Sequence, residues 1–301
     1  MKQRKVLLSL ITDKNDYQRE QAATARREAG RLGVLLDIVY ADSDPLCQSS
    51  QMLDAIFGKG MEKPDAILCE PAGTTMPQVA QAAVSAGIGW GVLNRDADYL
   101  TDLRRNAKVP AFIVTTDQKE IGRIQGRQFG VLLPKGGNAL YLQLPSGSAV
   151  SQARAEGMME AKPGTVNVRM LRAQFTEESA FNTINTWLQL STSHEAKIGL
   201  IAGQNDILAF GARRALETGT SGAEKEYWMS LPFLGCDACP ETGREWVKRG
   251  LLAASVVLPV TAGVALELAV RALENGVPPV QQTVIKPVSY PALEELNGKR
   301  S

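Results

Sequence analysis

The stretch IGLIAGQNDILAFGA, residues 198–212, contains a strand, a turn and the start of a helix. Ile198 to Ala202 is continuously apolar, which is typical of a parallel strand buried on both faces. Asn205 and Asp206 can cap the helix that follows, because their side chains accept hydrogen bonds from free backbone N–H groups. This order of strand, turn and helix predicts one repeating unit of an α/β sheet.

The same alternation covers almost the whole chain. Short apolar runs predict strands at 5–11, 34–41, 65–70, 88–93, 111–116, 138–144, 166–174, 197–203, 231–237, 253–258 and 283–289. Amphipathic patterns between them predict helices at 16–32, 45–59, 74–86, 118–132, 148–161, 178–191, 205–218, 240–250, 260–275 and 291–297. So many strands exceed one compact sheet. We therefore predict two lobes, each a doubly wound parallel sheet covered by helices on both faces.

Composition excludes several classes of protein. The 301 residues are 44% hydrophobic and 22% charged, so the chain can form two ordinary cores. The net charge of +1, without a basic run or stripe, argues against nucleic-acid binding. Four cysteines are too few for a disulfide scaffold. Cys236 and Cys239 have redox-type spacing, but we interpret them as small residues at the end of a strand.

The N-terminal residues bear on location. The apolar run from Val6 to Ile11 follows Met1–Lys5 directly, which leaves no room for a signal peptide. We expect either a cytoplasmic protein or a periplasmic protein whose export signal has been removed. The longest charge-free run, from Pro71 to Asn94, contains glutamines, a proline and glycines, so we expect no membrane insertion.

Polar side chains follow the predicted strands, at the edge where doubly wound sheets bind their ligands. Amides and charged groups alternate there with aromatic rings, which suits a carbohydrate: polar groups bind hydroxyls, and flat rings pack on C–H faces. The residues are Asn15, Tyr17, Glu70, Asn94, Arg95, Asp96, Asp117, Gln118, Ser148, Gln152, Arg154, Phe175, Gln204, Asn205, Asp206 and Asp237.

Motifs for catalysis, cofactors and metals are missing from the sequence. It contains no Gly-x-Gly-x-x-Gly after the first strand, no Walker loop and no Gly-x-Ser-x-Gly elbow, so we predict no cofactor and no enzyme activity. The one histidine, His194, falls in a predicted polar loop, so a Ser–His or Cys–His pair would have to use this histidine of the linker Ser191–Glu195. Catalysis by carboxylates alone stays open, although no spacing indicates it.

A calcium loop is also excluded. Asn94–Asp98 imitates its first positions, but Tyr99 occupies the sixth position instead of glycine, and Arg105 occupies the twelfth instead of glutamate. We expect Arg104, Arg105 and Lys108 to form a solvated turn, and we predict no metal site.

Several segments, taken in their order and spacing, resemble the ribose-type periplasmic sugar-binding proteins. These proteins share a fold with the ligand domains of lactose-repressor-like regulators. The most specific segments are Gly203–Ala212 and Phe233–Pro240; supporting segments are Val92–Asp96, Thr116–Gln118 with Gly122, Arg154–Gly157 and Lys248–Val256. The likeness runs from Val6 to about Pro291.

This resemblance implies the periplasmic binding protein type 1 fold, with two doubly wound parallel-sheet lobes joined by a three-strand hinge. The crossings would fall near Thr116, Leu258 and Lys286. One lobe would then contain residues 1–116 and 259–283, and the other residues 117–258 and 284–301. In the family, ligand binds in the cleft and closes the hinge.

The resemblance also implies ligand-binding residues. Asn15 and Tyr17 match the polar and aromatic pair after the first strand, and Arg95 matches an arginine that binds ring and hydroxyl oxygens. Phe175 matches an aromatic face, and Asn205 and Asp237 match the amide and carboxylate of the second lobe. Four of them have a simpler alternative: ion pairing of Arg95 with Asp96 or Asp98, capping by Asn205, and ordinary packing of the rings of Tyr17 and Phe175.

Three site positions depart from the ribose pattern. Asn94 replaces an aspartate, Gln152 replaces an arginine, and Leu258 replaces a hinge-side glutamine, whereas Arg154 matches a different, more often structural arginine. Because hydrogen bonds to charged groups contribute about 1.5–3 kcal/mol each, we do not expect ribose. We expect a ligand with a less polar edge beside Leu258, such as a deoxy sugar, another pentose or hexose, or a polyol.

Two classes of binding function remain, besides an enzyme on the same scaffold. The first is a solute receptor for a sugar or polyol that serves an ABC-type permease or chemosensing. The alternative is a cytoplasmic sensor or regulator of the same fold that signals to a protein. A DNA-binding headpiece would precede the first strand, and only four residues do, so this chain alone should not bind DNA.

Overall fold

The chain forms two compact units, each built from two separate stretches of sequence. The computed structural model describes residues 3–60, 62–73, 76–145 and 149–298; the predicted loop residue Ser148 lies outside them. Unit 1 is Met1–Thr116 with Val260–Ile285, and unit 2 is Asp117–Pro259 with Lys286–Ser301. The chain therefore passes between the units after residues 116, 259 and 285, where the sequence suggested crossings near Thr116, Leu258 and Lys286.

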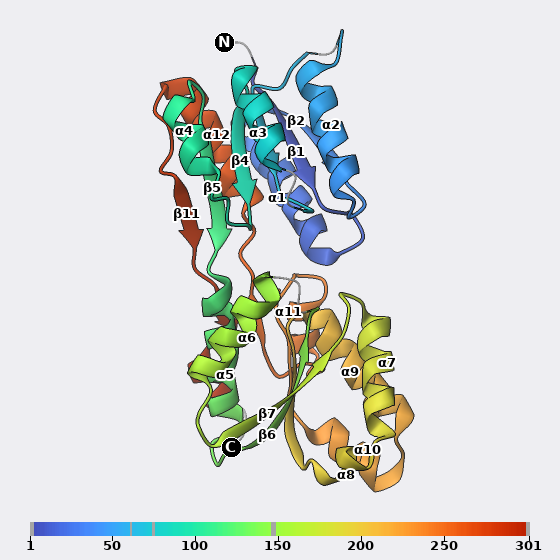
Figure 1. The fold of residues 1–301 in the computed structure, drawn as a ribbon. Coiled ribbons are helices and arrows are strands. Elements are labelled where there is room, and N and C mark those ends of the chain that lie inside the picture. The colour runs from blue at the N-terminus through green and yellow to red at the C-terminus, as the bar shows by residue number, and fades with distance from the viewer. Residues whose placement is uncertain (1–2, 61, 74–75, 146–148, 299–301) are drawn as a thin grey trace. The chain divides into compact units, whose positions relative to one another are not determined.

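Unit 1 contains a six-stranded parallel sheet in the order β11-β5-β4-β3-β1-β2 (Figure 1). Every pairing in it is parallel, as expected for strands linked by helical crossovers. The strands are β1 (Lys5–Leu10), β2 (Leu35–Tyr40), β3 (Ala66–Cys69), β4 (Gly89–Leu93), β5 (Ala111–Thr116) and β11 (Gln282–Ile285).

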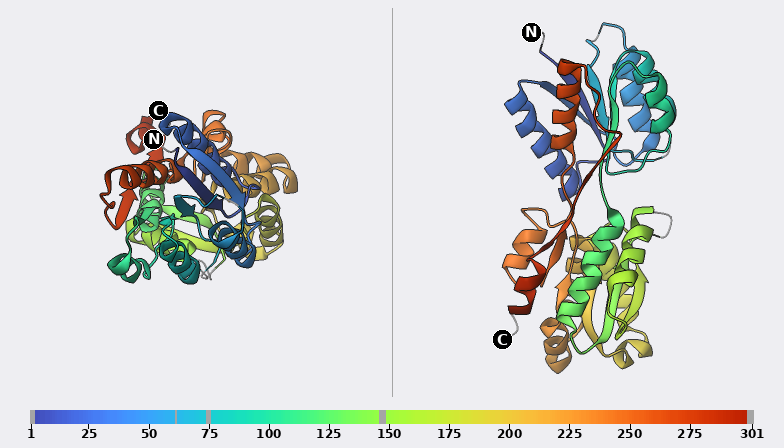
Figure 2. Two further views of the ribbon diagram at one scale, coloured as in Figure 1. Left: turned by 90° about the horizontal axis from the view of Figure 1, so that it is seen from above. Right: turned by 90° about the vertical axis from the view of Figure 1, so that its left-hand side faces the viewer.

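Helices cover both faces of this sheet. Helices α1 (Asp16–Leu32) and α12 (Ala262–Asn275) pack on one face, and they lie together on one side of the sheet in Figure 2. Helices α2 (Pro45–Phe57), α3 (Met76–Ser85) and α4 (Leu100–Asn106) pack on the other. Successive side chains of a strand point to opposite faces, so Leu8 joins the first core and Leu7 the second.

Unit 2 contains a four-stranded parallel sheet in the order β7-β6-β8-β9. Its strands are β6 (Gly137–Gln143), β7 (Val166–Arg172), β8 (Ile198–Gly203) and β9 (Phe233–Leu234). Isolated parallel bridges join Leu234 of β9 to Ala254, and Asp237 to Val257. Strand β10 (Ser255–Val257) pairs antiparallel with β12 (Val288–Tyr290). The helices are α5 (Gln118–Leu132), α6 (Ala149–Ala161), α7 (Glu177–Leu188), α8 (Ser191–Glu195), α9 (Asp206–Gly219), α10 (Gly222–Ser230), α11 (Gly243–Lys248) and α13 (Leu293–Gly298).

Two glycines bring α5 and α6 into backbone contact. A Cβ on Gly122 would overlap the carbonyl oxygen of Arg154, and a Cβ on Gly157 would overlap that of Lys119. Both positions belong to the segments that carry the family resemblance. Their absence of side chains sets how closely the two helices approach, and therefore where Arg154 lies.

Several predictions of local structure were wrong. The strand predicted at 283–289 is two strands, β11 and β12, because the chain leaves unit 1 at Lys286 and Pro287 has no N–H for a sheet ladder. His194 lies in helix α8 and not in a loop. Arg104 is not in a solvated turn: it lies in α4 and donates hydrogen bonds to the carbonyl oxygens of Ala111 and Pro279.

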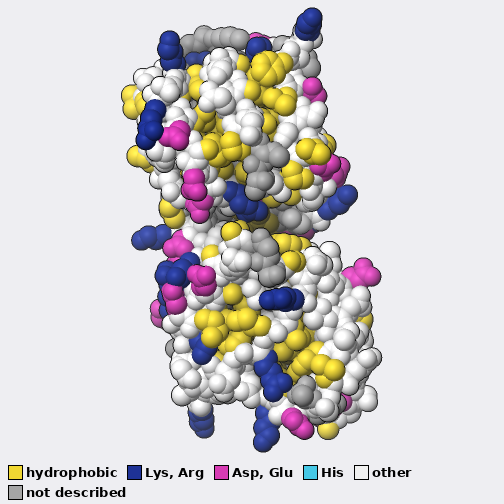
Figure 3. Space-filling view, viewed as in Figure 1, with side chains coloured by type: hydrophobic (Ala, Val, Ile, Leu, Met, Phe, Trp, Pro, Cys, Tyr) yellow, Lys and Arg dark blue, Asp and Glu magenta, His cyan; other side chains and the backbone are white. Residues whose placement is uncertain are grey.

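The surface gives two further observations. On the face drawn in Figure 3, lysine and arginine side chains of the described residues are interspersed with aspartate and glutamate. Among the helices of the described residues, none is both long enough and apolar enough to span a bilayer.

Candidate functional site

Polar side chains gather at the carboxyl ends of the parallel strands in each unit. The unit 1 cluster consists of Tyr17, Gln21, Glu70, Asn94 and Arg95. The unit 2 cluster consists of Gln118, Arg154, Asn205, Asp206 and Asp237.

Gln21 organises the unit 1 cluster from inside helix α1. The two hydrogens of its Nε2 are shared among three acceptors, the hydroxyl oxygens of Tyr17 (3.1 Å) and Thr261 (2.9 Å) and Glu70 Oε2 (3.3 Å). Its Oε1 accepts from the backbone N–H groups of Thr261 and Ala262, at 3.0 and 2.8 Å. This buried amide therefore links α1, the end of β3 and the start of α12, and it fixes the aromatic ring and carboxyl group beside it.

Asn94 follows β4 and has one uncommitted oxygen. It adopts a left-handed backbone conformation (φ 54°), which asparagine tolerates better than most residues. Its Nδ2 donates to the Tyr17 hydroxyl at 2.6 Å, but its buried Oδ1 has no hydrogen-bond partner among the described residues. The buried hydroxyl oxygen of Thr116, at the end of the neighbouring strand β5, is in the same state. A buried acceptor without a donor is costly, so both atoms are suited to receive a hydrogen bond from a bound molecule.

Glu70 and Arg95 supply the charge of the unit 1 cluster. Burial raises the pKa of the Glu70 carboxyl, and the positive charge of Arg95 is the largest influence opposing that shift. Arg95 is half-buried and donates from Nη1 to the carbonyl oxygen of Asn94 at 3.0 Å. No ion pair joins it to Asp96 or Asp98 in the described part of the chain.

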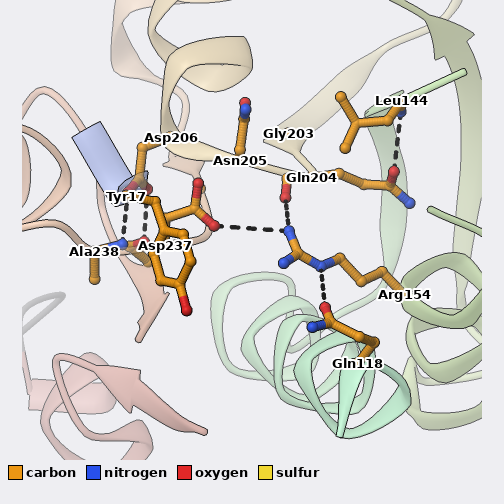
Figure 4. Close-up of polar contacts among 12 residues, drawn as sticks. Tyr17, Gln118, Leu144, Arg154, Gly203, Gln204, Asn205, Asp206, Asp237 and Ala238 are labelled. Carbon is orange, nitrogen blue, oxygen red and sulfur yellow. Dashed lines mark hydrogen bonds and ion pairs between the residues drawn. The ribbon is translucent and has the colours of Figure 1, made fainter. Parts of the chain in front are cut away.

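Arg154 is the buried cation of the unit 2 cluster. Its Nε donates to Gln118 Oε1 at 2.9 Å, and its Nη1 donates to the carbonyl oxygen of Gln204 at 2.6 Å. The same Nη1 lies 3.8 Å from Asp237 Oδ1. Figure 4 shows the guanidinium between these three partners. Because Arg154 is bound on several sides, it orients the Asp237 carboxylate.

Asp206 holds the loop that carries Asp237. Its two carboxylate oxygens accept from the Ser255 hydroxyl at 2.6 Å and from the Ala238 N–H at 2.7 Å. Burial raises the pKa of Asp206 well above its usual range, and the negative charge of Asp237 adds to this shift. Asp237 itself has φ 104°, a conformation that few residues other than glycine adopt, and 22% of its side chain is exposed.

Asn205 caps helix α9, as its sequence position suggested. Its Oδ1 accepts from the Leu208 N–H at 2.8 Å, and the side chain is buried. The loop that carries Asp237 lies beside it, because the N–H of the next residue, Asp206, donates to the carbonyl oxygen of Cys236 at 2.7 Å. Asn205 and Asp237 therefore lie on adjacent loops of the same sheet edge.

The remaining predicted site residues are more peripheral within their own units. Asn15 is exposed and caps α1 by accepting from the Gln18 N–H at 2.8 Å. Gln152 is exposed on α6, and Phe175, just before α7, has 56% of its surface exposed. Leu258 follows β10, is buried, and donates its N–H to the carbonyl oxygen of Asp237 at 3.2 Å.

Sequence reasoning missed the buried glutamines that support the unit 1 cluster. Gln18 and Gln21 lie on the same face of α1 as Ala22, Ala25 and Ala29, so a polar residue within an apolar stripe was the available signal. Gln48, on α2, similarly donates to the carbonyl oxygen of Glu70 at 2.9 Å. Such residues lie within helices, beneath the site, and a search for polar residues that directly follow strands does not find them.

The cysteines and possible metal ligands add no reactive centre to this description. Neither Cys236 nor Cys239 is in a disulfide bond, both are buried, and burial raises the pKa of the Cys236 thiol. Within the described residues, no group of three or more His, Cys, Asp or Glu side chains is placed to hold a metal ion.

Comparison with known families gives the identity of the fold. A family model described as the periplasmic binding protein domain matches residues 6–276. The chain belongs to the periplasmic binding protein family. Proteins of this family bind solutes and are normally periplasmic. Comparison of the sequence with curated proteins found no match.

Solved periplasmic binding proteins share the fold along almost their whole length. An ABC transporter solute-binding protein from Actinobacillus succinogenes, with bound D-allose, has a TM-score of 0.83 and 20% identity, covering 98% of this chain and 100% of that one. One from Bacillus halodurans, with bound myo-inositol, has a TM-score of 0.77 and 22% identity, covering 99% and 98%. The fructose-binding periplasmic domain of a hybrid two-component system has a TM-score of 0.77 and 22% identity, covering 98% and 94%.

Proposed function

We propose that this periplasmic binding protein binds a neutral sugar or polyol, without transforming it, and delivers it to an ABC-type permease. The family match supports solute binding. The solved proteins of the same fold that hold D-allose and myo-inositol support the class of solute. We propose that Asn15, Tyr17, Asn94 and Arg95 of unit 1 and Gln152, Phe175, Asn205, Asp237 and Leu258 of unit 2 contact this ligand.

The observation that carries the proposal is the state of the polar groups in the two clusters. The Asn94 oxygen is buried and lacks a donor, which a ligand hydroxyl can supply. Asp237 is partly exposed and held in an unusual backbone conformation by Asp206 and Arg154. Amide, carboxylate and guanidinium groups beside an aromatic ring are the usual partners of sugar hydroxyls and C–H faces.

A conformational mechanism follows from the proposal. If both units contact one ligand, those contacts are complete only in a ligand-bound arrangement of the units, so binding shifts the population toward it. A permease can then distinguish loaded from empty protein. We propose a periplasmic location for this step, which fractionation of cells that express the native gene would check.

Isothermal titration calorimetry over a panel of sugars and polyols tests the proposal. The panel should contain D-allose, D-ribose, a 6-deoxyhexose, D-fructose, myo-inositol and glycerol. We expect saturable binding of at least one member, and no product by mass spectrometry after long incubation. Asp237→Asn should weaken the binding by at least about tenfold, because it removes a charge-assisted hydrogen bond. The exposed Asp102→Asn is the matched control and should bind like the native protein.

Three results would contradict parts of the proposal. Turnover of any sugar or sugar phosphate would indicate an enzyme. Ribose binding far more tightly than every other ligand would contradict the expected effect of Asn94, Gln152 and Leu258. Equal affinity of the Asp237→Asn variant and native protein would remove Asp237 from the site.

A further inference from the structure

We infer that unit 2 contains a second binding site, for a small monocarboxylate with an apolar body, at the opposite edge of its sheet from Asn205 and Asp237. A cavity of about 290 Å³ lies at the amino ends of the β9 and β10 segments. Helices α9, α10 and α13 contribute to its wall. The lining residues are Leu132, Arg213, Met229, Ser230, Leu231, Pro232, Phe233, Val247, Gly250, Leu251, Leu252, Ala253 and Leu296.

Arg213 supplies the polar anchor of this cavity. Of the described residues that line it, Arg213 alone is charged. Its Nε is buried and has no hydrogen-bond partner among the described residues. The centre of its guanidinium lies 5.3 Å from the centroid of the Phe233 ring, a cation–π contact that holds the group at the wall. A charged donor buried without an acceptor is costly, so an acceptor from outside the chain is expected there.

The neighbouring arginine shows that this state is particular to Arg213. Arg214, the next residue of α9, is exposed and pairs with Glu177 across the surface. Its guanidinium also lies 5.9 Å from the Phe181 ring. The two arginines are therefore consecutive residues of one helix but differ in partner and surroundings.

The walls of the cavity indicate the rest of the ligand. Leu132, Phe233, Leu252 and Leu296 are buried and apolar, so one part of the wall can pack against an apolar group of a ligand. The volume is at the lower end of ligand pockets, which are roughly 300–1,000 Å³, so the ligand is small.

A carboxylate fits the anchor better than a phosphate. A planar carboxylate can accept from Nε and one Nη of a single guanidinium together. A phosphate dianion carries more charge than one arginine neutralises, and the described lining offers no second cation. The geometry points to a branched or aromatic monocarboxylate.

Solution NMR on the full chain tests this inference. The probes are 3-methylbutanoate and phenylacetate, and their neutral controls are the corresponding amides. We expect the carboxylates to shift the backbone signals of Phe233, Gly250 and Leu252, and the amides to bind at least about tenfold more weakly. Arg213→Gln should weaken carboxylate binding by at least about tenfold, whereas Arg214→Gln should leave it within about twofold of native protein.

A second variant keeps the test decisive if Arg213→Gln does not fold. Ser230 is exposed at the rim, so Ser230→Trp should obstruct the cavity without disturbing the core, and carboxylate binding should be lost. Amides that bind as well as carboxylates, signals that shift elsewhere in the chain, or no binding at about 10 mM probe would overturn the inference. These results are independent of the sugar panel, whose variants lie in other parts of the chain.

Discussion

Glu70 and Asp206 are buried carboxylic acids, one in each cluster, and they hold the more exposed members of the clusters in position. Glu70 accepts from Gln21 beside Tyr17, and Asp206 accepts from the loop that carries Asp237. Burial raises the pKa of both acids. Each acid therefore positions neighbouring groups through its hydrogen bonds, but its burial costs desolvation free energy. Replacing the acid measures the net effect on the free energy of unfolding.

Asp206→Ala should destabilise the protein by about 1–3 kcal/mol, because the Ala238 N–H and the Ser255 hydroxyl both lose their acceptor. Asp206→Asn should cost less, because its oxygen can serve Ala238 while the Ser255 hydroxyl turns to accept from its NH₂ group. Urea unfolding measures both. The exposed Asp102→Ala should change the free energy of unfolding by no more than about 0.5 kcal/mol. An equal loss in the Ala and Asn variants would argue against the proposed hydrogen bonds.

Glu70→Gln should change how stability depends on pH. The native pKa of Glu70 is raised above its ordinary value of 4.5, so between these values the folded chain holds a proton that the unfolded chain has released. Its contribution to the free energy of unfolding is therefore full below the unfolded pKa and is lost as pH rises through the native pKa. Glu70→Gln removes this loss, so the variant should gain stability relative to native protein as pH rises through this window.

Urea unfolding at a series of pH values from about pH 4 to about pH 8 measures this difference. The exposed Glu226→Gln is the control and should follow the native curve. A Glu70→Gln curve parallel to that of the native protein throughout would show that Glu70 does not titrate as described.

At the scale of elements, the close contact between α5 and α6 positions Arg154, and it is possible because Gly122 and Gly157 have no side chains. Gly157→Ala should destabilise by about 1–3 kcal/mol, because the added methyl group overlaps the carbonyl oxygen of Lys119 and the helices must separate. It should also weaken sugar binding, since Arg154 orients Asp237.

Gly30→Ala is the matched control for that variant. Gly30 lies in helix α1 and is exposed, and a Cβ there would meet nothing within 4 Å. The substitution should stabilise by about 0.5–1 kcal/mol through helix propensity alone. Chemical denaturation compares the two. If both alanines stabilised the protein, the close approach of α5 and α6 would not constrain the fold.

Elements with strong end signals could be predicted from sequence, and those without them could not. Helices α1 and α5 have the predicted bounds, because Asn15 and Asp117 cap their first turns and Gly33 ends α1 in a left-handed conformation. Helix α10 was missed because Trp228 is its one buried residue, so it has no apolar stripe to detect. The strand predicted at 231–237 is shorter, because Gly235 and Asp237 donate to residues 254 and 256 as isolated bridges.

The candidate site likewise has features that could be predicted from sequence and features that could not. Strand ends and caps located Asn94, Arg95, Asn205 and Asp237, because topology brings such residues to one edge of a sheet. Sequence could not give the conformation of Asp237 or the unpartnered oxygen of Asn94. Both depend on contacts between segments far apart in the chain.

At the scale of the whole molecule, unit 1 is completed by a distant segment. Its sheet ends in β11, and α1 and α12 contribute Ala22, Ala25 and Leu266 to the same core. A chain truncated after residue 259 lacks both elements, so it should lose hydrogen-exchange protection in β1 and α1 and should bind apolar dyes.

A chain truncated after residue 285 is the comparison. It keeps all of unit 1 and loses only β12 and α13 from unit 2, so exchange protection in β1 and α1 should match that of the full chain. Mass-spectrometric hydrogen exchange resolves the two cases. Native protection of β1 in the chain that ends at residue 259 would show that unit 1 does not need its second segment.

The interrupted sequence of unit 1 also has a consequence during synthesis. The ribosome makes β1 to β5 first, but α12 and β11 emerge only after residues 117–259 have been translated. Strands β1 to β5 are therefore made before the segment that completes their sheet, and the face of α1 that packs in this core is not yet covered by α12. Helices α5 to α9 can already assemble at that stage. We therefore expect much of unit 2 to begin folding before unit 1 is complete, and we expect the segment that is made first to need chaperones most.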